Sequence, residues 1–135
     1  MFETKGVGVE TKELAKRGGV AVVLSVVANL VVLQAVLVPE LVQGFEPLNV
    51  GPVAIFSVLG VVGATVTYAV VDRLSETPDR AFVTVAAVVL VLSFIPDILM
   101  LQSDPAATAP AVAVLMVMHV VVAVASVASL TGRLT

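Results

Sequence analysis

The chain has 135 residues, of which 59% are hydrophobic and 13% are charged, and its net charge at pH 7 is −3. Soluble domains contain about 25% charged residues, so this composition argues against a soluble fold and predicts one membrane-embedded domain. The absence of cysteine excludes disulfides, thiol redox chemistry and Cys-ligated metal clusters. Because there is no polybasic run, we expect no nucleic-acid partner.

Four apolar blocks predict four transmembrane helices. Each block is close to the ~20 residues that a helix needs to cross a hydrocarbon core of ~30 Å. The expected fold is therefore an all-α integral membrane four-helix bundle, with residues 1–18 as an N-terminal segment and residues 19–135 as the transmembrane domain. The four predicted spans are about 19–38, 51–71, 81–101 and 110–130.

The basic residues predict the orientation of these spans. All of them precede the first span, lie between the second and third, or follow the fourth: Lys5, Lys12, Lys16, Arg17, Arg73, Arg80 and Arg133. Positive charge is retained on the cytoplasmic side, so we expect a multi-pass plasma-membrane protein with both termini cytoplasmic. The first apolar block is longer than the core of a signal peptide and lacks a cleavage site, which indicates an uncleaved span.

The first span is preceded by a polar segment and contains two amides. We expect a solvated tail over residues 1–9 and a short surface helix over residues 10–18, with Gly18-Gly19 as a flexible joint. Asn29 and Gln34 are separated by about 140° around the helix. They do not share a narrow face, so one can point into the bundle and the other toward a neighbouring subunit.

Prolines mark the starts of the other three spans. Pro52 and Pro110 follow short polar loops, and Thr77-Pro78 combines an N-cap residue with a proline in the first helical turn.

The second span contains three small residues near its middle. Gly60 and Ala64 are one turn apart, with Gly63 beside them, and such a face lets another helix approach closely. Two interpretations are open: a seam between two copies of the chain, or helix packing within the monomer.

Asp97 is the one acidic residue well inside a predicted span. A carboxylate at the bilayer centre costs about 2.5–3.5 kcal/mol on insertion scales, and such residues usually face a bundle interior or a water-filled cavity. Pro96 removes one helical hydrogen bond beside it and loosens the helix. Asp97 is therefore either a proton- or cation-binding group near the outer mouth, or a carboxylate at the interface that ends the buried part of the span.

His119 is the only histidine, and it lies in the fourth span. Counting ~1.5 Å per residue places Gln34 and Asp97 in one layer and Asn29, Ser93 and His119 in another, all in the outer half of the membrane. His119 could relay protons with Asp97, or it could be a neutral imidazole bonded to Asn29 or Ser93. One histidine and one carboxylate are too few ligands for a metal, so we expect no metal or cofactor.

At Pro96-Asp97 and Met118-His119 the chain resembles a family of small, uncharacterised four-span prokaryotic membrane proteins, known as a domain of unknown function. The resemblance covers most of the chain from the first span onward. It implies the four-helix membrane fold, and it implies no activity, substrate or catalytic residue.

Three functions are compatible with the sequence. The first is a non-enzymatic accessory or scaffold subunit that packs against another membrane protein or against itself as a homo-oligomer. The second is an oligomeric proton- or cation-coupled transporter or channel that uses Asp97. The third is a protein that binds a hydrophobic ligand in the polar cluster of the outer half. The loops are too short to host an active site outside the bilayer, so we expect no enzyme.

Overall fold

The fold is all-helical across the part of the chain that the structure describes. The computed structural model describes residues 9–37 and 46–134. Four α-helices of 22 to 27 residues are each long and apolar enough to cross a membrane. They are α1 (Thr11–Leu37), α2 (Val50–Leu74), α3 (Pro78–Ser103) and α4 (Ala109–Leu130), with a 3-10 turn, η1 (Glu46–Leu48), before α2.

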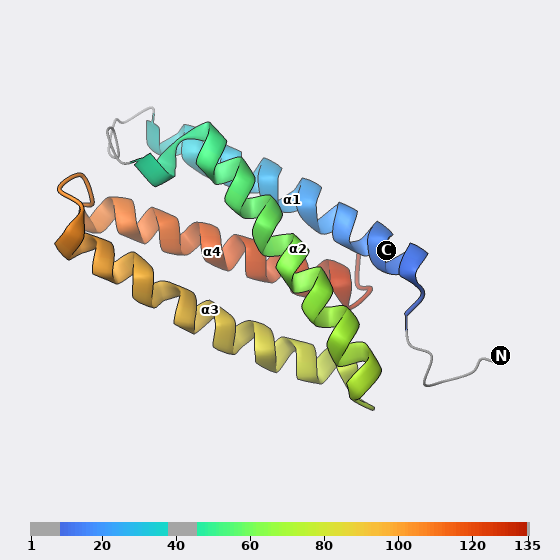
Figure 1. The fold of residues 1–135 in the computed structure, drawn as a ribbon. Coiled ribbons are helices and arrows are strands. Elements are labelled where there is room, and N and C mark those ends of the chain that lie inside the picture. Colours follow the sequence, from blue (N-terminus) through green and yellow to red (C-terminus); the bar gives the residue numbers. More distant parts are fainter. Residues whose placement is uncertain (1–8, 38–45, 135) are drawn as a thin grey trace.

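The four helices form a bundle in which both described ends of the chain lie at the same end (Figure 1). We call this the termini end; it also holds the short α2–α3 connection, and the opposite end is the far end. α1 packs against α2 and α4, and α3 packs mainly against α4. α2 and α3 meet at the termini end and diverge toward the far end (Figure 1).

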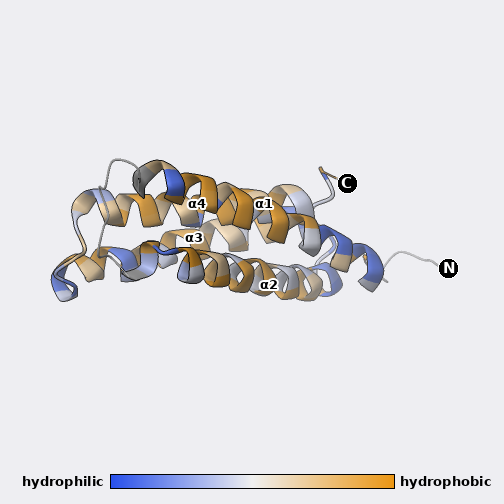
Figure 2. Ribbon diagram, turned by 90° about the horizontal axis from the view of Figure 1, so that it is seen from above, coloured by the Kyte–Doolittle hydropathy of each residue, from blue (hydrophilic) through white to orange (hydrophobic). Residues whose placement is uncertain are grey.

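The bundle is apolar on the outside. Large aliphatic side chains are exposed on every helix, among them Val31, Leu59, Val91 and Val124. Hydrophilic residues gather toward the two ends of the bundle, and the long middle section is hydrophobic (Figure 2). Since exposed aliphatic side chains are unfavourable in water and match a hydrocarbon solvent, this distribution fits a bundle that lies in a bilayer.

The core has two apolar ends and a polar middle. One apolar cluster, around Leu33, Val53 and Val112, fills the far end. A second, formed by Tyr68, Phe82 and Leu130, fills the termini end. Between them the buried residues include four small polar ones: Ser25, Asn29, Ser57 and Ser126.

In each of α2, α3 and α4, the proline that the sequence indicated as a start signal lies in the first helical turn. α3 begins at Pro78 with Thr77 as its N-cap residue. At the start of α4 the hydroxyl of Thr108 accepts a hydrogen bond from the backbone N–H of Ala111, with Pro110 in the first turn. α2 begins at Val50, so Pro52 lies in its first turn.

The predicted joint at Gly18-Gly19 is wrong. α1 begins at Thr11 and continues through both glycines without a break. Gly18 is buried, and a Cβ atom there would lie 2.9 Å from Oγ1 of Thr65 on α2. The residue is therefore a point of close approach between two helices, which requires a missing side chain rather than flexibility. Of the solvated tail predicted over residues 1–9, residues 1–8 lie outside the described residues, while Val9 packs against the bundle and its backbone N–H donates to Asp72.

Arg17 joins the first and last helices at the termini end. Its Nη1 donates to the carbonyl oxygen of Leu130 at 2.9 Å, and its Nε donates to Glu13 at 3.0 Å. The hydroxyl of Ser129 donates to the backbone carbonyl of Arg17 at 2.6 Å. A cation at the C-terminus of a helix satisfies free carbonyls and is favoured by the helix dipole.

Two further polar contacts hold the other helices at this end. The hydroxyl of Tyr68 on α2 donates to Asp79 on α3 at 2.6 Å, and its ring packs edge-on against Phe82 at a centroid distance of 5.1 Å. The backbone N–H of Val9 donates to the buried carboxylate of Asp72. Together with the Arg17 contacts, these bonds tie all four helices to one another at the termini end.

Candidate functional site

An Asp–His pair lies inside the bundle, between α3 and α4. Oδ2 of Asp97 and Nδ1 of His119 are 2.7 Å apart, which is within ion-pair distance, and both atoms are buried without a well-aligned hydrogen-bond partner. The Asp97 side chain is 6% exposed and that of His119 is 35% exposed. Nδ1 is buried against the carboxylate, whereas the other ring nitrogen, Nε2, is not among the buried atoms that lack a partner.

The two residues belong to different predicted layers, yet they are in contact. Side chains on a helix lean toward the N-terminus of their own helix. α3 begins at the termini end, so Asp97 leans that way, and α4 begins at the far end, so His119 leans toward Asp97. Because α3 and α4 are antiparallel, the two side chains lean toward each other, and this compensates for the difference in depth between their backbone positions. Asp97 is therefore buried and faces the bundle; it is the last buried residue of α3, and the helix itself continues through Pro96 to Ser103.

A second polar pair joins α1 to α2. Nδ2 of Asn29 donates to the hydroxyl of Ser57 at 2.9 Å and lies 3.5 Å from the carbonyl oxygen of Met118, the residue before His119. Asn29 is 2% exposed, and its Oδ1 has no partner. The two polar pairs are thus neighbours along α4, with His119 directed to Asp97 and not to Asn29.

The remaining predicted polar residues do not join either pair. Gln34 is exposed on α1, on a different face from buried Asn29. The hydroxyl of Ser93 donates to the carbonyl of Leu90 in its own helix at 2.6 Å. Neither residue therefore bonds to His119, although Ser93 lies near it in the groove described next.

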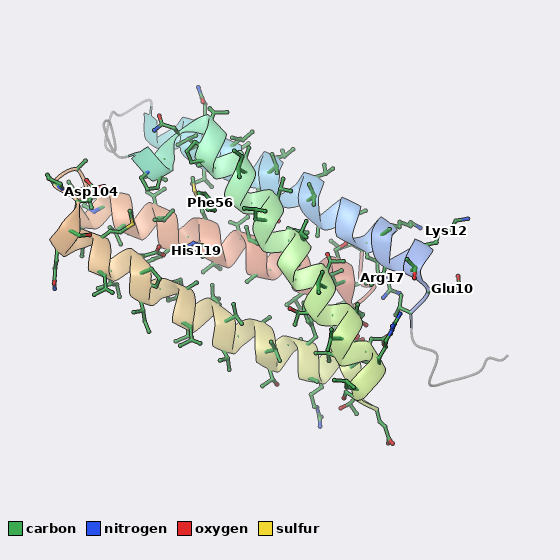
Figure 3. All side chains as sticks on the ribbon, viewed as in Figure 1. Glu10, Lys12, Arg17, Phe56, Asp104 and His119 are labelled. Carbon is green, nitrogen blue, oxygen red and sulfur yellow. The ribbon has the colours of Figure 1, made fainter. Side chains whose placement is uncertain are left out.

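A groove of about 410 Å³ runs between α2 and α3, with α4 as its floor. Its wall is almost entirely apolar, and it includes Gly60, Gly63, Phe82, Ser93, His119 and Ser126. In Figure 3, His119 on α4 lies in the space between α2 and α3, with Phe56 on the neighbouring part of α2. The groove's volume is within the range of small-molecule sites, about 300–1,000 Å³.

The small residues of α2 shape this groove. Gly60 faces α4, where an added Cβ would lie 3.2 Å from Cγ1 of Val122, and Ala64 packs against the apolar cluster at the termini end. A Cβ on Gly63 would meet nothing within 4 Å, so the missing side chain leaves open space in the groove. Part of this small-residue face is therefore used for packing within the chain, and part of it borders the groove.

Ser126 is the site residue that sequence reasoning missed. A serine or threonine inside a span usually bonds to a carbonyl of its own helix, as Thr65 and Thr67 do. Ser126 is 2% exposed and borders the groove, but its hydroxyl has no partner; Ser25 on α1 is also buried without one. The signal in the sequence was the spacing of His119 and Ser126, seven residues apart and so on one helix face.

The residues present do not form a metal centre. Among the described residues, no three His, Cys, Asp or Glu side chains lie close enough together to hold a metal ion. The arrangement instead offers a polar nitrogen and a hydroxyl on the wall of an apolar groove. Such a surface can hydrogen-bond to a molecule that is otherwise hydrocarbon.

Four apolar helices with polar side chains turned inward define the class of the protein, a small multi-pass membrane protein. Residues 9–135 match the model of a family of unknown function, DUF6069, and the chain belongs to this family. The match agrees with the resemblance seen at Pro96-Asp97 and Met118-His119. No curated protein and no solved structure matches the chain.

Proposed function

We propose that this protein binds a small hydrophobic molecule within the membrane, in the groove between α2 and α3. The observation that supports the proposal is the position of His119: its side chain is held by a buried carboxylate, and its exposed part borders an apolar groove of about 410 Å³. A protein that only packed against a partner would need neither the pair nor the groove.

The Asp97–His119 pair suits a binding role for a physical reason. A carboxylate in close contact with Nδ1 restrains the orientation of the ring and leaves the other nitrogen, Nε2, to meet a ligand. In a low-dielectric groove, a hydrogen bond at Nε2 of a restrained imidazole is worth more than the same bond in water. The ligand would thus be oriented by one polar contact and bound mainly through its apolar surface.

The proposed site shares His119 and Ser93 with the predicted ligand site and extends from them away from the outer half. His119 is ~15 Å from the first residue of α4, close to the middle of that helix. From there the groove extends toward Phe82 and Ser126, near the termini end. Following the basic residues, we propose that this end is cytoplasmic, so the groove would occupy the middle and the cytoplasmic half of the bilayer.

The other two functions have less support. A transport pathway would need polar residues in a continuous line, whereas Gln34 is exposed away from the bundle and Asp97 is enclosed by His119. An accessory or scaffold role, without catalysis, remains compatible with the apolar surface. No described feature of that surface distinguishes a protein partner or a second copy from lipid.

The test is to fill the groove and measure what the protein carries. The wild-type protein is purified from its own membrane in a mild detergent, and its bound small molecules are extracted and quantified by mass spectrometry. Gly63→Leu places a side chain into the groove, and Gly51→Leu is the matched control, because Gly51 is also open but lies outside the groove on the same helix.

We expect one class of small hydrophobic molecule to be retained by the wild type and Gly51→Leu, and reduced at least fivefold in Gly63→Leu. Equal retention by all three proteins, or no retained molecule, would contradict the proposal. Native mass spectrometry of the same wild-type sample gives an independent check. A constant second protein subunit together with an empty groove would favour the accessory role instead.

A further inference from the structure

We infer that the ligand of this groove is an uncharged, mostly hydrocarbon lipid that carries a small oxygen group, a carbonyl or a hydroxyl, bound at His119 and Ser126. The inference rests on the proposed function and specifies its ligand. Three properties of the groove lead to it: the depth of its polar groups, the absence of charged residues from its wall, and the unpaired hydroxyl of Ser126.

Depth excludes a large polar headgroup at the imidazole. His119 is near the middle of α4, ~15 Å from one end and ~17 Å from the other, whereas phospholipid headgroups remain at the bilayer surface. A group that reaches His119 must itself enter the hydrocarbon region. Burying one neutral carbonyl or hydroxyl with a hydrogen-bond partner is inexpensive, but burying a charged headgroup is not.

The wall of the groove has no charge to match an ionic ligand. None of the described residues that border it is Asp, Glu, Lys or Arg. Asp97 lies behind His119, and the two are directed at each other. A phosphate or an ammonium group would therefore lose its hydration without gaining an ionic partner.

Within this wall, two polar groups are available to a ligand. The hydroxyls of Ser93 and Thr67 donate to carbonyls of their own helices. The exposed imidazole of His119 and the hydroxyl of Ser126 therefore remain to hydrogen-bond to a ligand. Ser126 is 2% exposed as a residue and its hydroxyl has no partner; an unpaired buried hydroxyl is costly in a membrane, and a ligand oxygen would satisfy it.

The spacing of His119 and Ser126 also sets a minimum length for the ligand. They are seven residues apart on one face of α4, which is ~10 Å along the helix. Between them the α2 side of the groove is widened by Gly63, whose missing side chain leaves room for a flat or branched hydrocarbon. A ligand that contacts both groups therefore spans at least two helical turns. This suits an isoprenoid chain or a fused-ring lipid better than a small solute.

The experiment measures binding of four probes to the full chain in nanodiscs of phosphatidylcholine. Decylubiquinone supplies a carbonyl, farnesol supplies a hydroxyl, farnesane supplies hydrocarbon without oxygen, and dioleoylphosphatidylglycerol supplies a charged headgroup. Ser126→Ala tests the unpaired hydroxyl, and Ser93→Ala is its matched control because that hydroxyl is already bonded within its helix. His119→Phe tests the imidazole, and the double variant Asp97→Leu/His119→Phe tests it without leaving a buried carboxylate alone.

We expect one or both oxygen-bearing probes to bind in a Gly63→Leu-sensitive manner, and the stronger of the two identifies the oxygen group as carbonyl or hydroxyl. Ser126→Ala should weaken that binding about fivefold and the two His119 variants about tenfold, as for loss of one hydrogen bond, while Ser93→Ala leaves it unchanged. Farnesane should bind at least tenfold more weakly, and dioleoylphosphatidylglycerol should not compete.

Two results would overturn this inference. If farnesane or dioleoylphosphatidylglycerol binds as well as the oxygen-bearing probes and Gly63→Leu abolishes that binding, the groove is a hydrophobic site as proposed, but its ligand class is wrong. If no probe binds in a Gly63-dependent manner, and the wild type retains no molecule of its own, the proposed function fails as well. Equal effects of Ser93→Ala and Ser126→Ala would remove Ser126 from the site.

Discussion

The Asp97–His119 pair predicts a strongly non-additive set of mutations. His119→Phe removes the one partner of a carboxylate oxygen that is buried inside the bundle. Breaking a fully buried ion pair in this way costs about 3–5 kcal/mol in soluble proteins, while interhelical polar bonds in membranes average about 0.6 kcal/mol. Because the imidazole is one-third exposed to the groove, we expect an intermediate loss of about 2 kcal/mol in the free energy of unfolding.

The reverse substitution should cost less. Asp97→Leu leaves an imidazole that can stay neutral and still reach the groove, so we expect a loss of about 1 kcal/mol. Replacing both residues, as Asp97→Leu/His119→Phe, leaves no unpaired group and should also cost about 1 kcal/mol. The single losses sum to about 3 kcal/mol, which gives a coupling energy of about 2 kcal/mol.

The assay is reversible unfolding of the four proteins in mixed detergent micelles, with helicity followed as the denaturing detergent is increased. Helicity and oligomeric state before unfolding serve as controls for a native starting state. If the double variant loses the sum of the two single losses, the two side chains do not interact in the membrane, and the binding role proposed for His119 loses its structural support.

Two further predictions concern glycines at the termini end. Gly18→Ala should destabilise the bundle by about 1–3 kcal/mol in the same unfolding assay, because its Cβ would lie 2.9 Å from Thr65, whereas Gly19→Ala has open space and should be neutral or stabilising by up to about 1 kcal/mol. Equal effects at the two positions would place the helix contact elsewhere, and Thr65→Ala should rescue Gly18→Ala. Gly132→Ala should lower the melting temperature, since φ is +82° there and an added Cβ would lie 3.0 Å from Nη2 of Arg17; a left-handed residue with a side chain costs about 1–2 kcal/mol. An unchanged melting temperature would mean that Arg17 can move away without loss.

The sequence predicted the fold well because the bilayer imposes a simple rule on it. A span needs about 20 apolar residues, and the polar loops and prolines between such blocks are conspicuous. α3 and α4 begin where the N-cap residue and the prolines, Thr77-Pro78 and Pro110, predict a helix start. The sequence could not predict the role of Gly18. A glycine at a close helix contact and a glycine at a flexible joint have the same sequence signature.

The structure brings together two of the five predicted polar residues, Asp97 and His119, and leaves Gln34 exposed on another face. Counting residues placed Asp97 and His119 at different depths, because it ignores the direction in which side chains lean and the antiparallel course of α3 and α4. Ser126 was overlooked because a serine in a span usually bonds to its own helix, and only packing shows that it does not. The groove itself depends on how α2 diverges from α3, and no local sequence pattern predicts the angle between two helices.

The bond between Arg17 and the end of α4 has a consequence for how the protein is made. α1 leaves the ribosome before α4, yet the carbonyl of Leu130 on α4 is satisfied by Arg17 on α1, and Ser129 bonds back to the same residue. During synthesis α1, α2 and α3 are therefore made before this junction can form. A polypeptide interrupted before residue 129 would keep the bond from Arg17 to Glu13 and lose its bond to Leu130, so the basic end of α1 would be only partly paired in the membrane.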